Sequence, residues 1–196
     1  RFANLETDDV ENVFPDLADT HWAYDDVIAL YSNGFIDGYE DGTFRPNGQM
    51  SRAMFAMVLW RVAGSPASSA ALPFADVAAD AWYADAVRWA YAAGVINGVS
   101  TTAFDPESPV TREQMVTMLY RFAKAQGMDT TQGGMAAREF ADFESVSSYA
   151  LEAMDWAVNT GVLKGDNNRL LPQDNCTRAQ IVTMLYRAGR KVSDTI

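Results

Sequence analysis

Three arginines occupy the same place in three similar segments of the sequence. Each arginine follows a serine or threonine and opens an apolar segment with helical periodicity. A helix N-terminus leaves its first backbone N–H groups unpaired within the helix and carries partial positive charge, so it attracts anions. A guanidinium at the first helical position adds a permanent charge that can take a carboxylate through two hydrogen bonds. The sequence therefore predicts anion-binding positions at Arg52, Arg112 and Arg178.

The residues around these arginines predict where three helices begin. In two segments a threonine is followed three residues later by glutamine, which is a capping box, whereas the first segment has methionine in the glutamine's place. A second set of arginines, Arg61, Arg121 and Arg187, comes nine residues later, about 180° around the helix, and is predicted to lie outside the site. The predicted N-caps are Ser51, Thr111 and Thr177, and their reciprocal partners are Gln114 and Gln180.

Other kinds of chemistry lack the residues they need. A single cysteine, Cys176, and a single histidine, His21, allow no intramolecular disulfide and no Cys/His zinc site. The acidic stretch 37–41 does not follow the spacing of a calcium-binding EF-hand loop. We therefore expect no metal or cofactor, and we interpret Cys176 as a packing residue and His21 as a solvated one.

The charge balance limits the class of partner. Fifteen basic and 26 acidic residues give a net charge of −11, and the basic residues form no run. Such a surface repels nucleic acid and anionic lipid, so an anionic ligand needs a shaped pocket. The longest apolar run, residues 54–60, has 7 residues, against roughly 20 for a membrane-spanning helix. We expect neither nucleic-acid binding nor membrane insertion.

The chain contains three copies of one unit, offset by 60 and then 66 residues. Each copy opens with Phe-x-Asp, continues through an aromatic-rich helical segment to a glycine, passes through a polar loop to a proline, and ends in the arginine-led helix. The predicted divisions are an N-terminal lead-in at 1–13 and repeats at 14–64, 74–127 and 140–190. Since two helices cannot easily bury their apolar faces alone, we expect an all-α fold in which the helix-loop-helix repeats pack as a pseudo-threefold, single-chain trimer and the protein is monomeric.

These repeated features closely resemble the S-layer homology (SLH) domain. The likeness rests on the Phe-x-Asp start, the aromatic pair near the first helix, the loop GFIDGYEDGTFRP and the Ser/Thr-Arg-x-x helix start, and it runs from Phe14 to about Arg190. Domains of that family are trimers of repeats that anchor surface-layer proteins and exoenzymes to bacterial cell walls. The resemblance implies a noncatalytic anchor, secreted and held at the bacterial cell wall or S-layer. The sequence starts at Arg1 with neither an initiator Met nor a leader, which we interpret as a mature or excised fragment.

The resemblance also implies a ligand. Members of the family bind secondary cell wall polysaccharide in grooves between repeats, often through N-acetylmannosamine bearing a pyruvate ketal. Their Thr-Arg-Ala-Glu signature appears at 51–54, 111–114 and 177–180, with the arginine kept in all three copies and the final glutamate in none. Aromatic side chains would cover the sugar, and loop glycines would let the polymer approach the backbone. The implied ligand-binding residues are Arg52, Arg112, Arg178, Ser51, Thr111, Thr177, Gln114, Gln180, Trp22, Trp82, Tyr39, Gly38, Gly98 and Gly165.

Two other functions remain open at this point. Stacked helical repeats also form concave surfaces for protein partners, so a protein-interaction scaffold on the bacterial surface is the alternative. A glycosidase or peptidoglycan hydrolase needs two catalytic carboxylates, and no carboxylate pair is peculiar to one repeat. We therefore expect that the chain is not an enzyme. The remaining tryptophans, Trp60, Trp89 and Trp156, are predicted to pack in the core.

Overall fold

The computed structural model describes residues 11–193, and side chains as far as residue 190. Within that range the chain is helical and contains isolated β-bridges rather than strands, as the all-α prediction requires. Residues 1–10 of the predicted lead-in lie outside the described residues. The α-helices are α1 (Tyr24–Ser32), α2 (Arg52–Val62), α3 (Ala84–Ala92), α4 (Arg112–Ala125), α5 (Leu151–Asn159) and α6 (Arg178–Ser193), and the 3-10 helices are η1 (Ala136–Glu139), η2 (Phe143–Ser145) and η3 (Ser148–Ala150).

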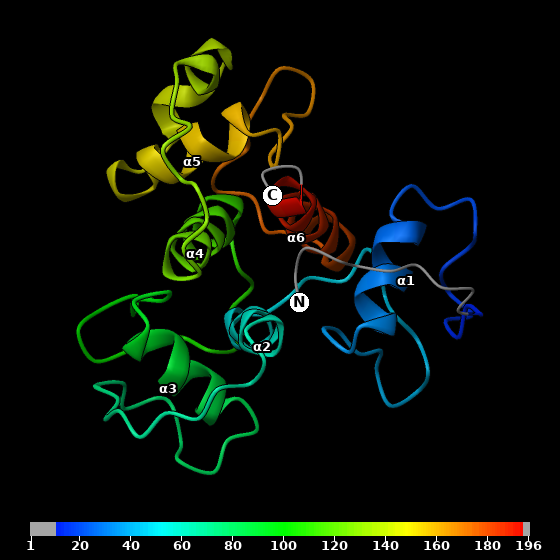
Figure 1. Cartoon of the computed structure of the whole chain (residues 1–196), viewed down its shortest axis with the longest axis vertical. Helices are drawn as coiled ribbons and strands as arrows, with labels where there is room; N and C mark the ends of the chain where they lie inside the picture. The colour runs from blue at the N-terminus through cyan, green and yellow to red at the C-terminus, as the bar shows by residue number, and fades with distance from the viewer. Residues whose placement is uncertain (1–10, 194–196) are drawn as a thin grey trace.

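The six helices form three pairs around a common centre (Figure 1). The inner helices α2, α4 and α6 surround the middle, and α1, α3 and α5 lie outside them. Each outer helix packs on the inner helix of the preceding repeat, so that α3 contacts α2, α5 contacts α4 and α1 contacts α6. The packing units therefore cross the sequence repeats, and the contact between α1 and α6 joins the first repeat to the third.

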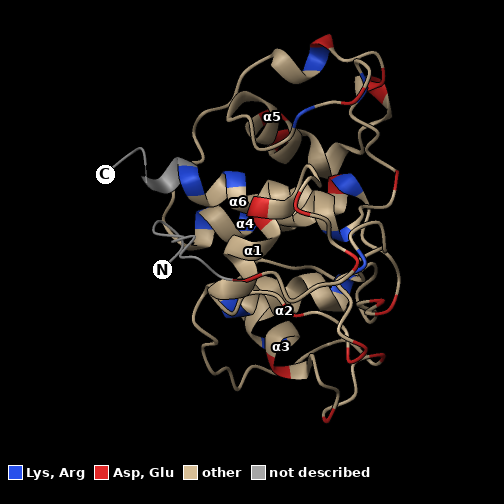
Figure 2. Ribbon diagram, turned by 90° about the vertical axis from the view of Figure 1, so that its right-hand side faces the viewer, with Lys and Arg blue, Asp and Glu red and all other residues tan. Residues whose placement is uncertain are grey.

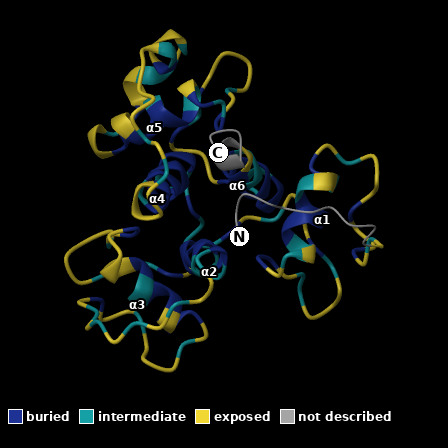
Figure 3. Cartoon of the chain, in the orientation of Figure 1, coloured by how far each residue is buried: buried dark blue, intermediate teal, exposed yellow. Residues whose placement is uncertain are grey.

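The inner helices bury most of their surface, which explains their apolar periodicity. In α2 the apolar residues at helical spacing, Phe55, Val58, Leu59 and Val62, are all buried. Figure 3 shows this burial along the inner helices, whereas the connecting loops are largely exposed. The buried side chains of all three repeats belong to one hydrophobic cluster. The repeats thus share a core that none of them encloses alone.

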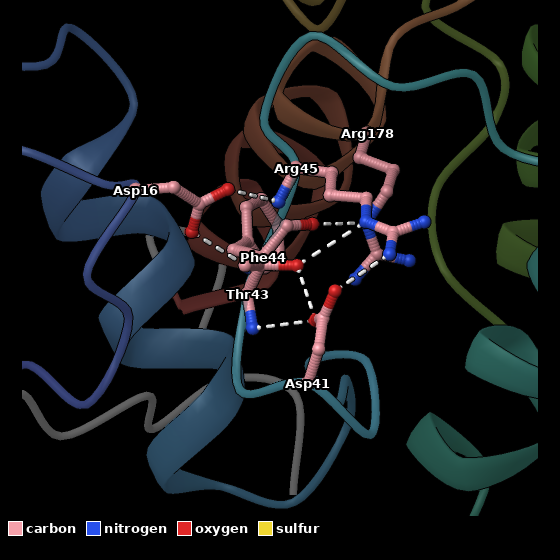
Figure 4. Close-up of polar contacts among 6 residues, drawn as sticks. All are labelled: Asp16, Asp41, Thr43, Phe44, Arg45 and Arg178. Atoms are coloured by element: carbon pink, nitrogen blue, oxygen red, sulfur yellow. Dashed lines mark hydrogen bonds and ion pairs between the residues drawn. The ribbon is translucent and has the colours of Figure 1, made fainter.

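The aspartate of each Phe-x-Asp motif holds the loop that precedes the next inner helix. In repeat 1, Asp16 accepts hydrogen bonds from the backbone N–H groups of Phe44 (2.8 Å) and Arg45 (2.7 Å) (Figure 4). Arg45 has a φ of 57°, a left-handed conformation that costs a non-glycine residue free energy. The carboxylate compensates for this strain. The corresponding groups are Asp76 with Phe104 and Asp105 (φ 59°), and Asp142 with Leu170 and Leu171 (φ 54°).

The backbone closes a small ring of hydrogen bonds where the three repeats meet. The N–H of Met50 donates to the carbonyl oxygen of Cys176 (3.4 Å), that of Cys176 to Val110 (3.0 Å), and that of Val110 to Met50 (3.0 Å). All three side chains are buried. Burial also raises the pKa of the Cys176 thiol to about 12, so the thiol is protonated and unreactive at neutral pH, as expected of a packing residue.

No helix among residues 11–193 is both long enough and apolar enough to cross a membrane.

We predict that Asp142→Asn lowers the free energy of unfolding by about 1–3 kcal/mol at neutral pH, because a charged acceptor of two backbone N–H groups is lost. Partial burial raises the pKa of Asp142, but the N–H groups of Leu170 and Leu171 outweigh that effect, so the pKa lies below its ordinary value. The stabilisation is therefore complete above the unfolded-state pKa of about 3.9 and is lost as the pH falls through the lower folded-state pKa.

Urea unfolding of wild type and variant between pH 2 and pH 7 checks this prediction. The difference between the two curves should be largest near pH 7 and shrink at the acid end. A difference that stays constant with pH would contradict the assigned role of the carboxylate.

Candidate binding grooves between the repeats

Each of the three motif arginines is buried at the junction between its own repeat and the next. Arg178, only 4% exposed, donates through Nε to the carbonyl oxygen of Phe44 (2.8 Å) and through Nη2 to that of Asp37 (2.7 Å). Figure 4 shows its guanidinium against the loop of repeat 1. The equivalent bonds join Arg52 to Phe104 (2.8 Å) and Asn97 (3.1 Å), and Arg112 to Leu170 (2.7 Å) and Lys164 (3.5 Å). The arginines therefore connect the repeats in a closed cycle, in which Nη1 takes no part.

Aromatic rings cover two of these guanidinium groups. Arg178 lies 4.6 Å from the ring centroid of Phe44 and 4.9 Å from that of Tyr39, and Arg52 lies 4.7 Å from that of Phe104. Burial lowers the pKa of Arg52 and of Arg178, yet arginine stays charged in proteins. Each of these two junctions thus holds a fixed cation.

The backbone at the helix starts is already used, which corrects the sequence-based argument for an anion site there. In α4 the N–H of Arg112 donates to Asp174 (2.9 Å) and that of Glu113 to Pro172 (3.0 Å), both carbonyl oxygens of repeat 3. An anion cannot use these donors, so the guanidinium is the group left to bind one. The same pattern joins Arg52 to Ser108 and Ala53 to Pro106, and Arg178 to Gly48 and Ala179 to Pro46.

The predicted N-cap residues also act within their own helices. Thr111 and Gln114 form the complete reciprocal capping box of α4. Ser51 accepts only the N–H of Met54 (3.2 Å), as expected where methionine replaces glutamine. Thr177 and Gln180 make both bonds of the box in α6, at 3.1 and 3.2 Å. A role of these residues in ligand binding stays a prediction.

A groove of about 380 Å³ brings together three of the predicted site residues, Arg52, Gly98 and Gln114. Arg52 comes from repeat 1, whereas Gly98 and Gln114 come from the loop and inner helix of repeat 2. Repeat 3 contributes Tyr149, whose ring is half-exposed. Residues of all three repeats therefore form one groove. Its lining is Arg52, Asn97, Gly98, Val99, Gln114, Thr117, Met118, Arg121 and Tyr149.

Arg121 lies in this groove, contrary to the expectation that it lies outside the site. The half-turn between Arg112 and Arg121 is as predicted, but an inner helix has a neighbouring repeat on each side. Arg112 therefore contacts repeat 3, while Arg121 shares a groove with Arg52 of repeat 1. In the same way Arg61 pairs with Asp37 (2.5 Å), the residue whose carbonyl oxygen accepts Arg178.

A second hollow, about 720 Å³, contains Gly38, Tyr39 and Trp82 of the predicted set. Trp82 is 60% exposed, and Trp22, on the corresponding turn of repeat 1, is 62% exposed. Both indole rings are thus accessible to a ligand. His21 stacks on Trp22, with 5.3 Å between ring centroids, and its Nδ1 accepts the N–H of Ala23 (3.2 Å), so it has a packing role besides solvation.

The loop glycines have a structural reason to be glycine. A Cβ added at Gly38 would lie 2.6 Å from Cε1 of Phe14, and one at Gly98 would lie 2.6 Å from Cε1 of Phe74. Gly165 is closer still to Phe140. These glycines let the phenylalanine of each Phe-x-Asp motif cover the loop. An additional role in polymer approach stays a prediction.

Within the acidic loop of repeat 1, Asp41 is paired with residues of the same loop. Asp41 accepts bonds from the N–H (3.0 Å) and hydroxyl (2.6 Å) of Thr43 and from Nη2 of Arg45 (2.7 Å) (Figure 4). The Thr43 hydroxyl and then Arg45 hold the pKa of Asp41 well below its usual range. Among the described residues, no three His, Cys, Asp or Glu side chains are grouped to hold a metal ion.

Sequence reasoning missed Glu113, a buried carboxylate that positions Tyr149. Glu113 accepts bonds from the N–H (2.9 Å) and hydroxyl (2.7 Å) of Ser147 and from the hydroxyl of Tyr149 (2.9 Å). Burial, and then Glu113, raise the pKa of Tyr149, so it stays a neutral donor. The available signal was the sequence itself, since alanine stands at this position in the other two repeats, at Ala53 and Ala179.

Arg112 and Gly165 lie at the third junction, between repeats 2 and 3, since Arg112 donates to the carbonyl oxygen of the residue before Gly165. Arg112 is 6% exposed, and Leu170 replaces the phenylalanine that covers the other two arginines. This guanidinium therefore lacks the ring that Phe44 and Phe104 supply elsewhere. Of the tryptophans predicted to pack in the core, Trp156 is buried, and Trp89 is partly buried against the core and edge-on to Phe122. Trp60 is partly buried outside the core cluster, where its Nε1 donates to the carbonyl oxygen of Pro66 (2.9 Å), so the prediction does not hold for Trp60.

Comparison with known sequences identifies relatives of the whole chain. The sequence model of the S-layer homology domain matches residues 13–56, 73–116 and 139–182. An amylopullulanase of Thermoanaerobacterium thermosulfurigenes is 30% identical over 94% of this chain, and an endoglucanase of a Bacillus species is 31% identical over 91%. The S-layer protein sap of Bacillus anthracis is 27% identical over 91% of the chain. The chain spans 10%, 19% and 21% of these relatives' own lengths, respectively.

We predict that Arg112→Ala lowers the free energy of unfolding by about 3 kcal/mol, because two carbonyl oxygens of repeat 3 lose a charged donor. Arg88→Ala is the matched control, since Arg88 lies on α3 in an ion pair with the exposed Asp85 and should cost less than about 1 kcal/mol. Urea unfolding measures both. Equal losses in the two variants would contradict the inter-repeat role of Arg112.

Proposed function

Since the chain belongs to the S-layer homology domain family, we propose that it anchors its parent protein by binding an anionic, pyruvate-bearing cell-wall polysaccharide in the grooves between its repeats. The S-layer homology domain is a noncatalytic anchoring module, and its three matches take up most of the chain. Attachment at the bacterial cell wall follows from the family. The pyruvylated ligand is our proposal, as is the choice of groove.

The observation that carries the proposal is the cationic lining of the groove at Arg52. Two guanidinium groups, of Arg52 and Arg121, and the phenol of Tyr149 face the same hollow. No carboxylate is among the residues that line it. Guanidinium groups donate paired hydrogen bonds to carboxylates, and a neutral phenol adds another donor. This arrangement suits a carboxylate presented on a polar, bulky ligand.

The rest of the surface makes the local charge of this groove important. The chain carries a net charge of −11, and Figure 2 shows acidic residues along the loops at one edge of the molecule, with basic residues among them. Bulk attraction would therefore not bring an anion to the protein. Only a pocket in which arginine is held by the fold can select one, and the buried inter-repeat bonds hold Arg52 in this way.

The exposed aromatic rings supply the second component of sugar binding. Trp82 and Tyr39 line one hollow, in which their rings can cover the apolar face of a pyranose. Trp22 has a similar exposure in repeat 1. We propose that the polymer contacts these rings while its carboxylate pairs with a groove arginine. The implied ligand contacts of Gln180, Gly165 and the capping threonines belong to the same proposal.

The cyclic connection of the repeats supports a monomer. Arg178 of repeat 3 bonds to the loop of repeat 1 within the same chain. The junction that a partner chain would otherwise complete is therefore occupied. We propose that the module acts as a monomer attached to a larger protein, since the relatives include hydrolytic enzymes and S-layer proteins several times its length.

Co-sedimentation with purified cell-wall sacculi tests the proposal. We expect wild type to pellet with untreated sacculi and to lose most of that binding after mild acid removes ketal pyruvate. Arg121→Gln should weaken pelleting about tenfold without loss of stability, because Arg121 lines the groove without joining the repeats through the buried bonds of Arg52.

Arg88→Gln is the matched control, because it removes an arginine from an exposed ion pair on α3. It should pellet like wild type. Binding that survives pyruvate removal would overturn the ketal ligand. A chain that does not pellet with sacculi at all, but captures a surface protein, would favour the interaction scaffold.

A further inference from the structure

One loop position carries a different charge in each of the three repeats. In repeats 1 and 2 its residue contacts two arginines, a motif arginine and the arginine nine residues after a motif arginine. The position follows the buried Ile36, Ile96 and Leu163, directly before the loop glycine, and is occupied by Asp37, Asn97 and Lys164. In every repeat its backbone carbonyl oxygen accepts a hydrogen bond from Nη2 of a motif arginine. The backbone at this position is therefore fixed by the fold, while its side chain is free to vary.

In repeat 1 the side chain at this position is a carboxylate that is already paired. Asp37 accepts Arg178 on its carbonyl oxygen (2.7 Å) and pairs with Nη1 of Arg61 through its carboxylate (2.5 Å). The side chains of Asp37 and Arg61 are 63% and 31% exposed. A ligand carboxylate at this junction would have to compete with the carboxylate of Asp37 for the N–H donors of Arg61.

In repeat 2 the equivalent side chain is a neutral amide in the same place. Asn97 accepts Arg52 on its carbonyl oxygen (3.1 Å), and its side-chain oxygen accepts Nη1 of Arg121 (3.2 Å) in the amide orientation that also lets its nitrogen donate to Ile96 (3.0 Å). No carboxylate lines this groove, and neither Arg52 nor Arg121 forms an ion pair among the described residues. A guanidinium binds an amide oxygen less strongly than a carboxylate, so a ligand anion displaces the amide of Asn97 at a smaller cost in free energy.

Repeat 3 reverses the charge at this position. Lys164 accepts Arg112 on its carbonyl oxygen (3.5 Å) and carries an exposed ammonium group. The second arginine of this repeat, Arg187, interacts electrostatically with Asp26 of α1, whose carboxylate accepts the hydroxyl of Thr183 (2.5 Å). The carboxylate that faces Arg187 therefore comes from α1 and not from the position of Lys164.

We infer that the residue at position 37, 97 or 164 determines whether its groove accepts an anionic sugar. The Asn97 groove takes a carboxylate-bearing sugar, whereas Asp37 acts as an internal competitor that excludes the anion from Arg61 and Arg178 at the junction between repeats 3 and 1. This inference rests on the proposed polysaccharide binding. It adds which residue decides where the anionic sugar units bind.

Two isosteric substitutions test the inference. The probes are the methyl glycoside of N-acetylmannosamine bearing a pyruvate ketal, and the same glycoside without the ketal, titrated by calorimetry. Asn97→Asp should weaken binding of the ketal sugar on the order of tenfold at low salt, because a carboxylate then pairs with Arg121. The loss should shrink at high salt, and binding of the neutral glycoside should not change.

Asp37→Asn should have the opposite effect, because it frees Arg61 at the junction between repeats 3 and 1. We expect the number of ketal-sugar sites per chain to rise by one. Asp85→Asn removes the same charge from the exposed ion pair with Arg88 on α3 and should leave both affinity and stoichiometry as in wild type. Thermal unfolding of each variant verifies that the fold is kept.

The outcomes separate this inference from the proposed function. A wild-type chain that binds the ketal sugar, with both variants unchanged, would overturn the inference and leave the function standing. Equal losses for the ketal and neutral sugars in Asn97→Asp would also overturn it, since they would indicate a structural effect. A wild-type chain that binds neither sugar nor sacculi would overturn the proposed function and the inference together.

Discussion

The fold depends on satisfying three guanidinium groups that are almost completely buried. A buried charge is tolerated only when hydrogen bonds replace the water it has lost. Arg52, Arg112 and Arg178 obtain those bonds from backbone carbonyl oxygens of the next repeat, never from their own. The first N–H groups of each inner helix likewise find their acceptors in the next repeat. Every repeat therefore completes its neighbour, and only a cycle gives all three arginines and all three helix starts their acceptors.

The same constraint places the grooves. A guanidinium that is fixed on Nε and Nη2 keeps its position when a ligand arrives, so little entropy is lost in ordering it. Each inner helix also faces two junctions, with one arginine at its start and another half a turn around at its far end. For α4 these are Arg112, bonded to repeat 3, and Arg121, in the groove with Arg52. The groove is thus a by-product of the contacts that hold the repeats together.

Much of the local structure could be predicted from the sequence, because it depends on neighbouring residues. The capping boxes of α4 and α6 and the apolar face of α2 are examples. The contacts between repeats could not, since periodicity does not tell which repeat's carbonyl faces a given N–H group. For that reason the sequence predicted free N–H groups at the helix starts and placed Arg121 outside the site, and both predictions were wrong. Glu113 was missed because a motif position that is usually small gives no hint of a partner 34 residues away.

The pairing of α1 with α6 has a consequence for how the protein folds. The bonds from Arg178 to Phe44 and Asp37 span 134 and 141 residues of sequence, so they form only when nearly the whole chain is present. Contacts of such long range carry a large loop-closure cost and slow the search for the native state. A growing chain therefore holds an incomplete core, with one apolar flank open, until its last repeat is made. Cooperativity then extends over all three repeats, in contrast to an open solenoid that can gain or lose repeats one at a time.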